Sequence, residues 1–222
     1  MKFFLNGIVL AIILSLLTIL SLFIGVSKVS ITDIFTLSKE QMNIIVSSRI
    51  PRTVSILISG STLALAGLIM QQMMQNKFVS PTTAGTMEWA KLGILISMIF
   101  FPQENIMIKL VFAVVLSIAG TFLFVKLVQY IRFTDVIFIP LLGIMLGGIV
   151  SSFSTFIALR TNTVQSIGNW LNGNFAIITS GRYEILYLSI PLLIFTYIFA
   201  NHFTIAGMGK DFSNNLGVNY ER

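Results

Sequence analysis

The residues best suited to chemistry lie in a polar stretch between Gln71 and Gly93, in the middle of an otherwise apolar chain. Its first residues are amides. Gln71, Gln72 and Gln75 are spaced so that part of the cluster shares one face of a helix. Inside a helical bundle such a face forms a polar seam, whereas at a membrane boundary the same amides are often simple solvated caps. The sequence leaves both interpretations open.

The same stretch contains a signal for the start of a helix and a carboxylate close behind it. Ser80 is suited to an N-cap and Pro81 to the first helical position, so a new helix is predicted to begin between Pro81 and Thr86. Glu88 then falls within the first two turns of that helix. A charge there is costly in a membrane unless it is paired or wetted, and Lys91 is the local candidate partner.

Two arginines flank a proline upstream of the amides, in the order Arg49-Ile-Pro-Arg52. Pro51 disfavours helix at the preceding residue and is suited to the first turn of a following one. We therefore expect both arginines to project from one rim of the membrane. They could anchor the chain at the interface, or their guanidinium groups could bind carboxylates of a docking partner in a bidentate manner.

Other chemistries are excluded by composition. The chain has no cysteine and one histidine, His202, so we expect neither a thiolate nor a histidine-rich metal site, and no cofactor. Gly209 and Lys210 superficially suggest a P-loop, but Thr204 stands where the first glycine is required. No catalytic motif and no basic run for nucleic acid is found.

Composition defines the elements that must position these residues. The chain is 55% hydrophobic and only 10% charged, compared with about 25% charged in soluble domains. It is therefore predicted to be an integral membrane protein, all-α, with six spans of about 20 residues each. The expected spans are residues 3–26, 53–74, a third that ends near 101, 110–131, 136–159 and 185–200. Residues 160–183 are too polar for a span and are predicted to contain a short surface helix.

Charge counting does not orient these spans. The 14 lysines and arginines divide evenly between the two sides of the predicted topology, so the positive-inside rule gives no preference.

Small residues recur four positions apart in two of the spans. Gly60 and Ala64 form one such pair, and Gly143 and Gly147 form another. The spacing predicts close approach of neighbouring helix backbones and needs no functional explanation.

The last residues, 202–222, are the most polar part of the chain. Asp211 or Ser213 could begin a short helix and Gly217 could end it. Such a segment could enter a groove on another protein, or it could be a frayed terminus.

Three of these pieces, taken together and in this order, resemble the FecCD-type permeases of ABC importers, which carry ferric siderophores, haem and cobalamin. The pieces are Arg49-Ile-Pro-Arg-Thr53, then Gly60-x-x-x-Ala-Leu-Ala-Gly67 with Gln71 and Asn76-Lys-Phe-Val-Ser-Pro81, and finally residues 207–217. The family usually has Asn-Pro-Leu-Ala-x-Pro where this chain has Asn76 to Pro81. In that difference the chain resembles the ferric-siderophore subgroup of the family.

The resemblance implies a fold of about ten helices per subunit and a set of partners. Two permease subunits, identical or different, would surround one translocation path, with ABC ATPase subunits on the cytoplasmic side. An extracytoplasmic substrate-binding protein would deliver the ferric siderophore. The N-terminus would lie in the cytoplasm and the chain in the bacterial cytoplasmic membrane. Residues 1–222 would form a single transmembrane permease domain, C-terminally truncated. The alternative is a truncated fragment or scaffold that does not transport.

The resemblance also assigns roles by position. Arg49 and Arg52 would dock the binding protein on the outer face. The translocation path or gate would include Gln71, Gln75, Asn76, Ser80, Pro81, Thr82 and Glu88. Residues 203–222 would couple the permease to the ATPase, with Gly207, Gly209, Asp211, Leu216 and Gly217 as the coupling residues.

Overall fold

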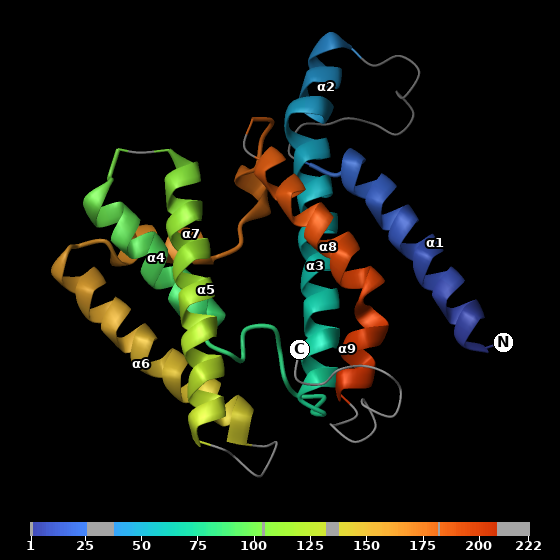
Figure 1. The fold of residues 1–222 in the computed structure, drawn as a ribbon. Helices are drawn as coiled ribbons and strands as arrows, with labels where there is room; N and C mark the ends of the chain where they lie inside the picture. Colours follow the sequence, from blue (N-terminus) through green and yellow to red (C-terminus); the bar gives the residue numbers. More distant parts are fainter. Residues whose placement is uncertain (1, 26–37, 104, 132–137, 182, 208–222) are drawn as a thin grey trace. The chain divides into compact units, whose positions relative to one another are not determined.

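The described part of the chain is built from helices, as predicted, and contains no strand (Figure 1). The computed structural model describes residues 2–25, 38–103, 105–131, 138–181 and 183–207. The elements in chain order are α1 (Lys2–Phe23), α2 (Lys39–Ile44), η2 (Ile45–Arg49), α3 (Ile50–Met73), α4 (Thr86–Phe100), α5 (Ile106–Ile131), α6 (Phe138–Arg160), α7 (Val164–Leu171), η3 (Phe175–Ile177), η4 (Glu184–Leu188), α8 (Ser189–Ile198) and α9 (Ala200–Gly207).

Helices stand at all six predicted positions, but they differ in length. Four segments within the described residues are long and apolar enough to cross a membrane, namely Asn6–Phe23, Lys39–Met73, Ile106–Tyr130 and Phe138–Arg160. The other two are shorter. At 1.5 Å per residue, the 15 residues of α4 reach about 22 Å, less than the roughly 30 Å of a hydrocarbon core. The sixth predicted span corresponds to the shorter apolar helix Glu184–Ile198, which is formed by η4 and α8.

The chain forms two compact units, Met1–Thr62 with Asn174–Phe195, and Leu63–Gly173 with Thr196–Arg222. In the first unit the prediction of a break at Pro51 is wrong. The helix runs from α2 through the π-helical turn η2 into α3 without interruption. Proline lacks the N–H that would bond the carbonyl of Ser47, four residues earlier, and this carbonyl accepts the N–H of Ser180 at 2.9 Å instead. The wider π turn and this outside donor let the helix continue through the proline.

The second unit has its core where α4 packs on α5 and α6. Leu95 is fully buried there, among apolar side chains of α6 and α7. Two glycines permit the close approach of α4 and α5. A Cβ on Gly93 would lie 2.4 Å from the carbonyl oxygen of Phe112, and one on Gly120 would lie 2.2 Å from the ring of Trp89. The tryptophan of the polar stretch is therefore a packing residue of the bundle.

The short helix predicted within residues 160–183 is present as α7. Ile167 is its buried residue, whereas Trp170 is 40% exposed. The Lys109 ammonium group of α5 lies 5.6 Å from the centre of the Trp170 ring, within the range of a cation–π interaction.

Candidate functional site

Five of the predicted gate residues lie on the loop of residues 74–85, here called the gate loop, which joins α3 to α4. The other two, Gln71 and Glu88, lie on α3 and α4. Polar side chains form hydrogen bonds with the backbone of this loop. The Gln71 amide donates to the carbonyl of Lys77 at 2.9 Å, and the Asn76 amide oxygen accepts the N–H of Phe78 at 2.9 Å. These bonds satisfy backbone groups that no helix pairs. The amides are therefore not simply solvated caps.

Hydroxyl groups organise the second half of the gate loop. The Ser80 hydroxyl lies 3.0 Å from that of Thr82 and 3.1 Å from that of Thr83. The Ser80 N–H also donates to the Thr83 hydroxyl at 2.9 Å. The predicted helix start at Ser80 and Pro81 is therefore replaced by turns, in which Thr83 bonds back to Ser80.

Helix α4 begins at Thr86, at the late end of the predicted interval. Its N-cap is Gly85, with a φ of 76° in the left-handed region, where a side chain is disfavoured. The preceding turn is closed by the Gly85 N–H, which donates to the Thr82 carbonyl at 2.9 Å. Local sequence favoured Ser80 and Pro81 as the start, but the tight turn at residues 80–85 delays the helix.

This turn packs against two glycines of α6, Gly143 and Gly147. A Cβ on Gly143 would lie 2.1 Å from the Thr83 carbonyl oxygen. The Gly147 backbone lies against Gly85, since a Cβ on Gly85 would lie 3.2 Å from the Gly147 Cα. The close approach predicted from the Gly143 and Gly147 spacing is confirmed, but the partner is a loop rather than a helix. At Gly60, by contrast, no described atom lies within 4 Å of an added Cβ.

A cavity of 540 Å³ opens where the gate loop meets α6. It brings together three of the predicted gate residues, Ser80, Thr82 and Glu88. Its other lining residues are Phe78, Thr83, Gly85, Gly143, Ile144, Gly147, Gly148 and Ser151. Phe78 is 97% exposed. The remaining gate residues of the prediction lie elsewhere along the gate loop or, for Gln71, on α3.

Glu88 lies in the first turn of α4, where the positive end of the helix dipole favours a carboxylate. Lys91, its predicted partner, points to α6. Its ammonium group lies 3.5 Å from the Ser151 hydroxyl and 3.4 Å from that of Thr155. Glu88 on α4 and Ser151 on α6 are thus polar lining residues of the cavity from two helices. Sequence analysis did not include Ser151 and Thr155, because isolated hydroxyls in an apolar helix carry no motif.

Arg49 and Arg52 both bind the carboxyl end of α1. The Arg49 side chain is 3% exposed and donates to the Leu22 carbonyl at 2.8 Å. Arg52 is half-buried and donates to the carbonyls of Ser21 and Ile24, each at 3.2 Å. Carbonyls in the last turn of a helix have no partner within it, and cations near them are stabilising.

Of the predicted coupling residues, Gly207 is described and the other four lie outside the described residues. Gly207 ends α9 and packs against the end of α3, since a Cβ there would lie 2.4 Å from the Gln72 carbonyl oxygen. Gln72 and Thr204 meet at this crossing. Thr204 was missed as a site residue because nothing local to α9 indicates its partner on α3.

The long apolar helices define a multi-pass membrane protein, and the fold is that of a transporter permease. A solved chain described as a metal-chelate type ABC transporter in an inward-facing conformation superposes with a TM-score of 0.78 at 22% identity, covering 100% of this chain and 70% of its own. Petrobactin import system permease protein YclN of Bacillus subtilis (strain 168) is 53% identical over 96% of this chain and 67% of its own length. Petrobactin import system permease protein FatD of Bacillus anthracis is 37% identical over 97% of this chain and 63% of its own length.

A profile of the FecCD transport family matches residues 13–222. The chain belongs to the FecCD transport family, whose members are permease subunits of ABC importers rather than enzymes. It spans about two thirds of the length of the two petrobactin import permeases.

Proposed function

We propose that this chain belongs to a permease subunit that carries ferric siderophores across the bacterial cytoplasmic membrane. The observation that carries the proposal is the family match over residues 13–222, together with the 53% identity to a petrobactin import permease. The ferric anguibactin permease FatD of Vibrio anguillarum is a further relative, at 34% identity. Relatives of the cobalamin type are more distant, at 23% identity.

The proposal includes the partners and the orientation that the resemblance implies. ABC ATPase subunits on the cytoplasmic side supply the energy, an extracytoplasmic binding protein delivers the chelate, and a second permease subunit completes the path. The N-terminus lies in the cytoplasm. In this orientation the arginine end of α3 faces outward and the gate loop faces the cytoplasm, because α3 is a single helix between them. Residues 1–222 belong to the permease domain, and residues 203–222 couple it to the ATPase.

The gate loop forms part of the wall of the cavity, through Phe78, Ser80, Thr82, Thr83 and Gly85. At 540 Å³ the cavity is within the size range of small-molecule sites, about 300–1,000 Å³. Its lining combines hydroxyls and one carboxylate with glycine backbone and the apolar side chains of Phe78 and Ile144. We infer that chelate specificity is set mainly by the binding protein, and that the gate loop opens and closes the path.

Uptake in cells tests the proposal. Deletion of the gene is expected to abolish uptake of a radiolabelled ferric siderophore, and the restored full-length gene is expected to recover it. Ferric petrobactin, ferric anguibactin, ferric citrate and cobalamin are compared in parallel. Unchanged uptake of every ferric chelate, or a loss confined to cobalamin, would contradict the proposal.

Docking at the outer rim gives a second prediction, centred on Arg52 because Arg49 is buried against α1. Arg52→Gln and Arg52→Glu both remove the guanidinium group from the α1 carbonyls. Only the glutamate repels acidic groups on a binding protein. We expect Arg52→Glu to weaken docking by about tenfold more than Arg52→Gln, because a like-charge contact is unfavourable and about 1.4 kcal/mol of repulsion at the exposed rim gives that factor.

The measurement is the affinity of the purified binding protein for the permease in nanodiscs, at low and high salt. The excess effect of glutamate should shrink as salt screens it. Equal affinities of the two variants would show that Arg52 caps α1 and does not dock the partner.

A further inference from the structure

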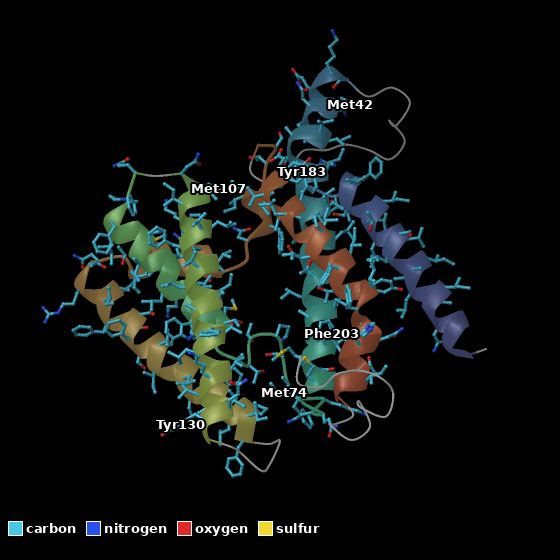
Figure 2. The ribbon with its side chains drawn as sticks, in the orientation of Figure 1. Met42, Met74, Met107, Tyr130, Tyr183 and Phe203 are labelled. Atoms are coloured by element: carbon cyan, nitrogen blue, oxygen red, sulfur yellow. The ribbon has the colours of Figure 1, made fainter. Side chains whose placement is uncertain are left out.

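The carboxyl end of α3 and the end of α9 are joined by an amide clasp, defined as Gln72, Gln75, Thr204 and Gly207. The Thr204 hydroxyl donates to the Gln72 amide oxygen at 2.5 Å. The Gln75 amide donates to the Gly207 carbonyl. Gly207 lies so close to α3 that no side chain fits, as the 2.4 Å between its added Cβ and the Gln72 carbonyl oxygen indicates. Figure 1 shows the ends of α3 and α9 side by side, and Figure 2 labels Met74 and Phe203 near them.

Gln75 adopts a backbone conformation that glutamine rarely takes. Its φ is 46°, in the left-handed region. Its N–H bonds the Gln72 carbonyl and the Asn76 N–H bonds the Gln71 carbonyl, both at 3.1 Å. This pair of bonds is the Schellman ending of a helix, in which the left-handed position is usually glycine. A glutamine there accepts backbone strain that glycine would avoid.

Strain of this kind, together with a specific contact, points to a functional use of the side chain. The side chain that glycine would lack is the one that donates to Gly207. The second bond of the clasp uses Gln72, in the last turn of α3. Both amides thus hold α9, and neither faces the cavity at α6.

The clasp lies between the gate loop and the proposed coupling segment, the two parts of the chain that the proposed function connects. The gate loop follows α3 directly and packs its residues 83–85 on α6. Residue 207 is followed in the sequence by the rest of the proposed coupling segment. We propose that Gln72 and Gln75 are positioning residues that transmit movement of the coupling segment to the gate loop. The transmission of movement rests on the proposed function. The contacts of the clasp do not depend on it.

Movement passes through the clasp in three contacts. When the ATPase displaces the segment after Gly207, the last turn of α9 moves with it. The two hydrogen bonds and the backbone contact at Gly207 then move the last turn of α3. The gate loop is bonded to that turn by the Gln71 amide, which donates to the Lys77 carbonyl, and by the Asn76 N–H, which donates to the Gln71 carbonyl. Its position against Gly143 and Gly147 therefore changes.

Replacement of Gln75 by glycine separates this role from a structural one. Gln75→Gly relieves the left-handed backbone, so a purely structural role predicts unchanged or higher thermal stability and unchanged transport. The clasp predicts stable protein with intact ATP hydrolysis but less transport per ATP, by about fivefold, the factor expected for one lost hydrogen bond of typical strength. The measurement uses the full-length permease with its ATPase in proteoliposomes.

Thr204 offers a matched pair. Thr204→Ser keeps the hydroxyl that donates to Gln72, whereas Thr204→Val keeps the shape and removes the donor. We expect the serine variant to transport nearly as the wild type does, and the valine variant to lose coupling as Gln75→Gly does. Wild-type coupling in both Gln75→Gly and Thr204→Val would overturn the inference.

A cross-linking experiment does not depend on transport. The chain has no cysteine, so Gln72→Cys with Thr204→Cys introduces one pair of thiols. A short bifunctional thiol reagent should join them in membranes, and Gln72→Cys with Ser152→Cys, on the exposed face of α6, should not react. Failure of the folded protein to cross-link overturns the clasp. If the pair cross-links but the wild type transports no chelate, the clasp stands and the proposed function fails.

Discussion

Gly143→Ala is expected to destabilise the protein by about 3 kcal/mol, the upper end of the usual cost of overpacking. The added methyl group would lie 2.1 Å from the Thr83 carbonyl oxygen and 3.0 Å from the Ala84 Cα. These are backbone atoms of a buried turn, so they have no flexible end that could move aside. The gate loop must shift away from α6 or the helix must tilt.

Neighbouring glycines of α6 provide graded controls. Gly148→Ala should be neutral, because no described atom lies within 4 Å of its added Cβ. Gly147→Ala should be intermediate, since its Cβ would meet the Gly85 Cα at 3.3 Å and a Glu88 carboxylate oxygen at 3.4 Å. Thermal unfolding of the three variants in detergent measures the order. Equal melting temperatures for Gly143→Ala and Gly148→Ala would contradict the packing of the gate loop on α6.

This series also shows what the sequence could predict. The spacing of Gly143 and Gly147 indicated a close approach, and the approach is present. The partner could not be predicted, because small residues allow any backbone segment to pack closely. Their spacing does not indicate which segment packs there. Uncharged length similarly located the helices, since a membrane removes charge from spans. It could not show that α4 begins only at Thr86, where the turn before it ends.

The polar sites were harder to predict, for a different physical reason. Proline at position 51 indicated a helix break, but the Ser180 N–H, remote in sequence, takes over the Ser47 carbonyl. Gln75 was predicted as a gate residue, yet its partner is Gly207 on another helix. Hydrogen bonds between distant segments leave no periodic trace in the chain. The residue types could therefore be identified, whereas their partners required the structure.

Arg49 gives the second large expected effect, because it is a buried cation that binds the end of a helix. None of the residues of α1 from Asn6 to Phe23 is buried. Polar contacts hold it near its carboxyl end. The Ser21 and Thr53 hydroxyls are 3.0 Å apart there, beside the carbonyls that the arginines bind.

Arg49→Met is therefore expected to cost about 2–3 kcal/mol, the usual worth of hydrogen bonds to a charged group. The methionine keeps the apolar stem but leaves the Leu22 carbonyl without its donor. Arg52→Met is the matched control. It should cost about 1 kcal/mol or less, because Arg52 is half-exposed and water can replace it at the carbonyls of Ser21 and Ile24.

Two measurements distinguish detachment of α1 from a general loss of stability. Thermal unfolding in detergent gives the cost, and a cysteine introduced at Ser21 reports whether the end of α1 becomes accessible to a water-soluble maleimide. Arg49→Met should increase labelling at temperatures well below unfolding, whereas Arg52→Met should change it little. If both variants label alike, the two arginines share the attachment equally, and the burial of Arg49 confers no advantage. If Arg49→Met alone releases α1, the arginine motif orders the first helix of the permease before any partner arrives.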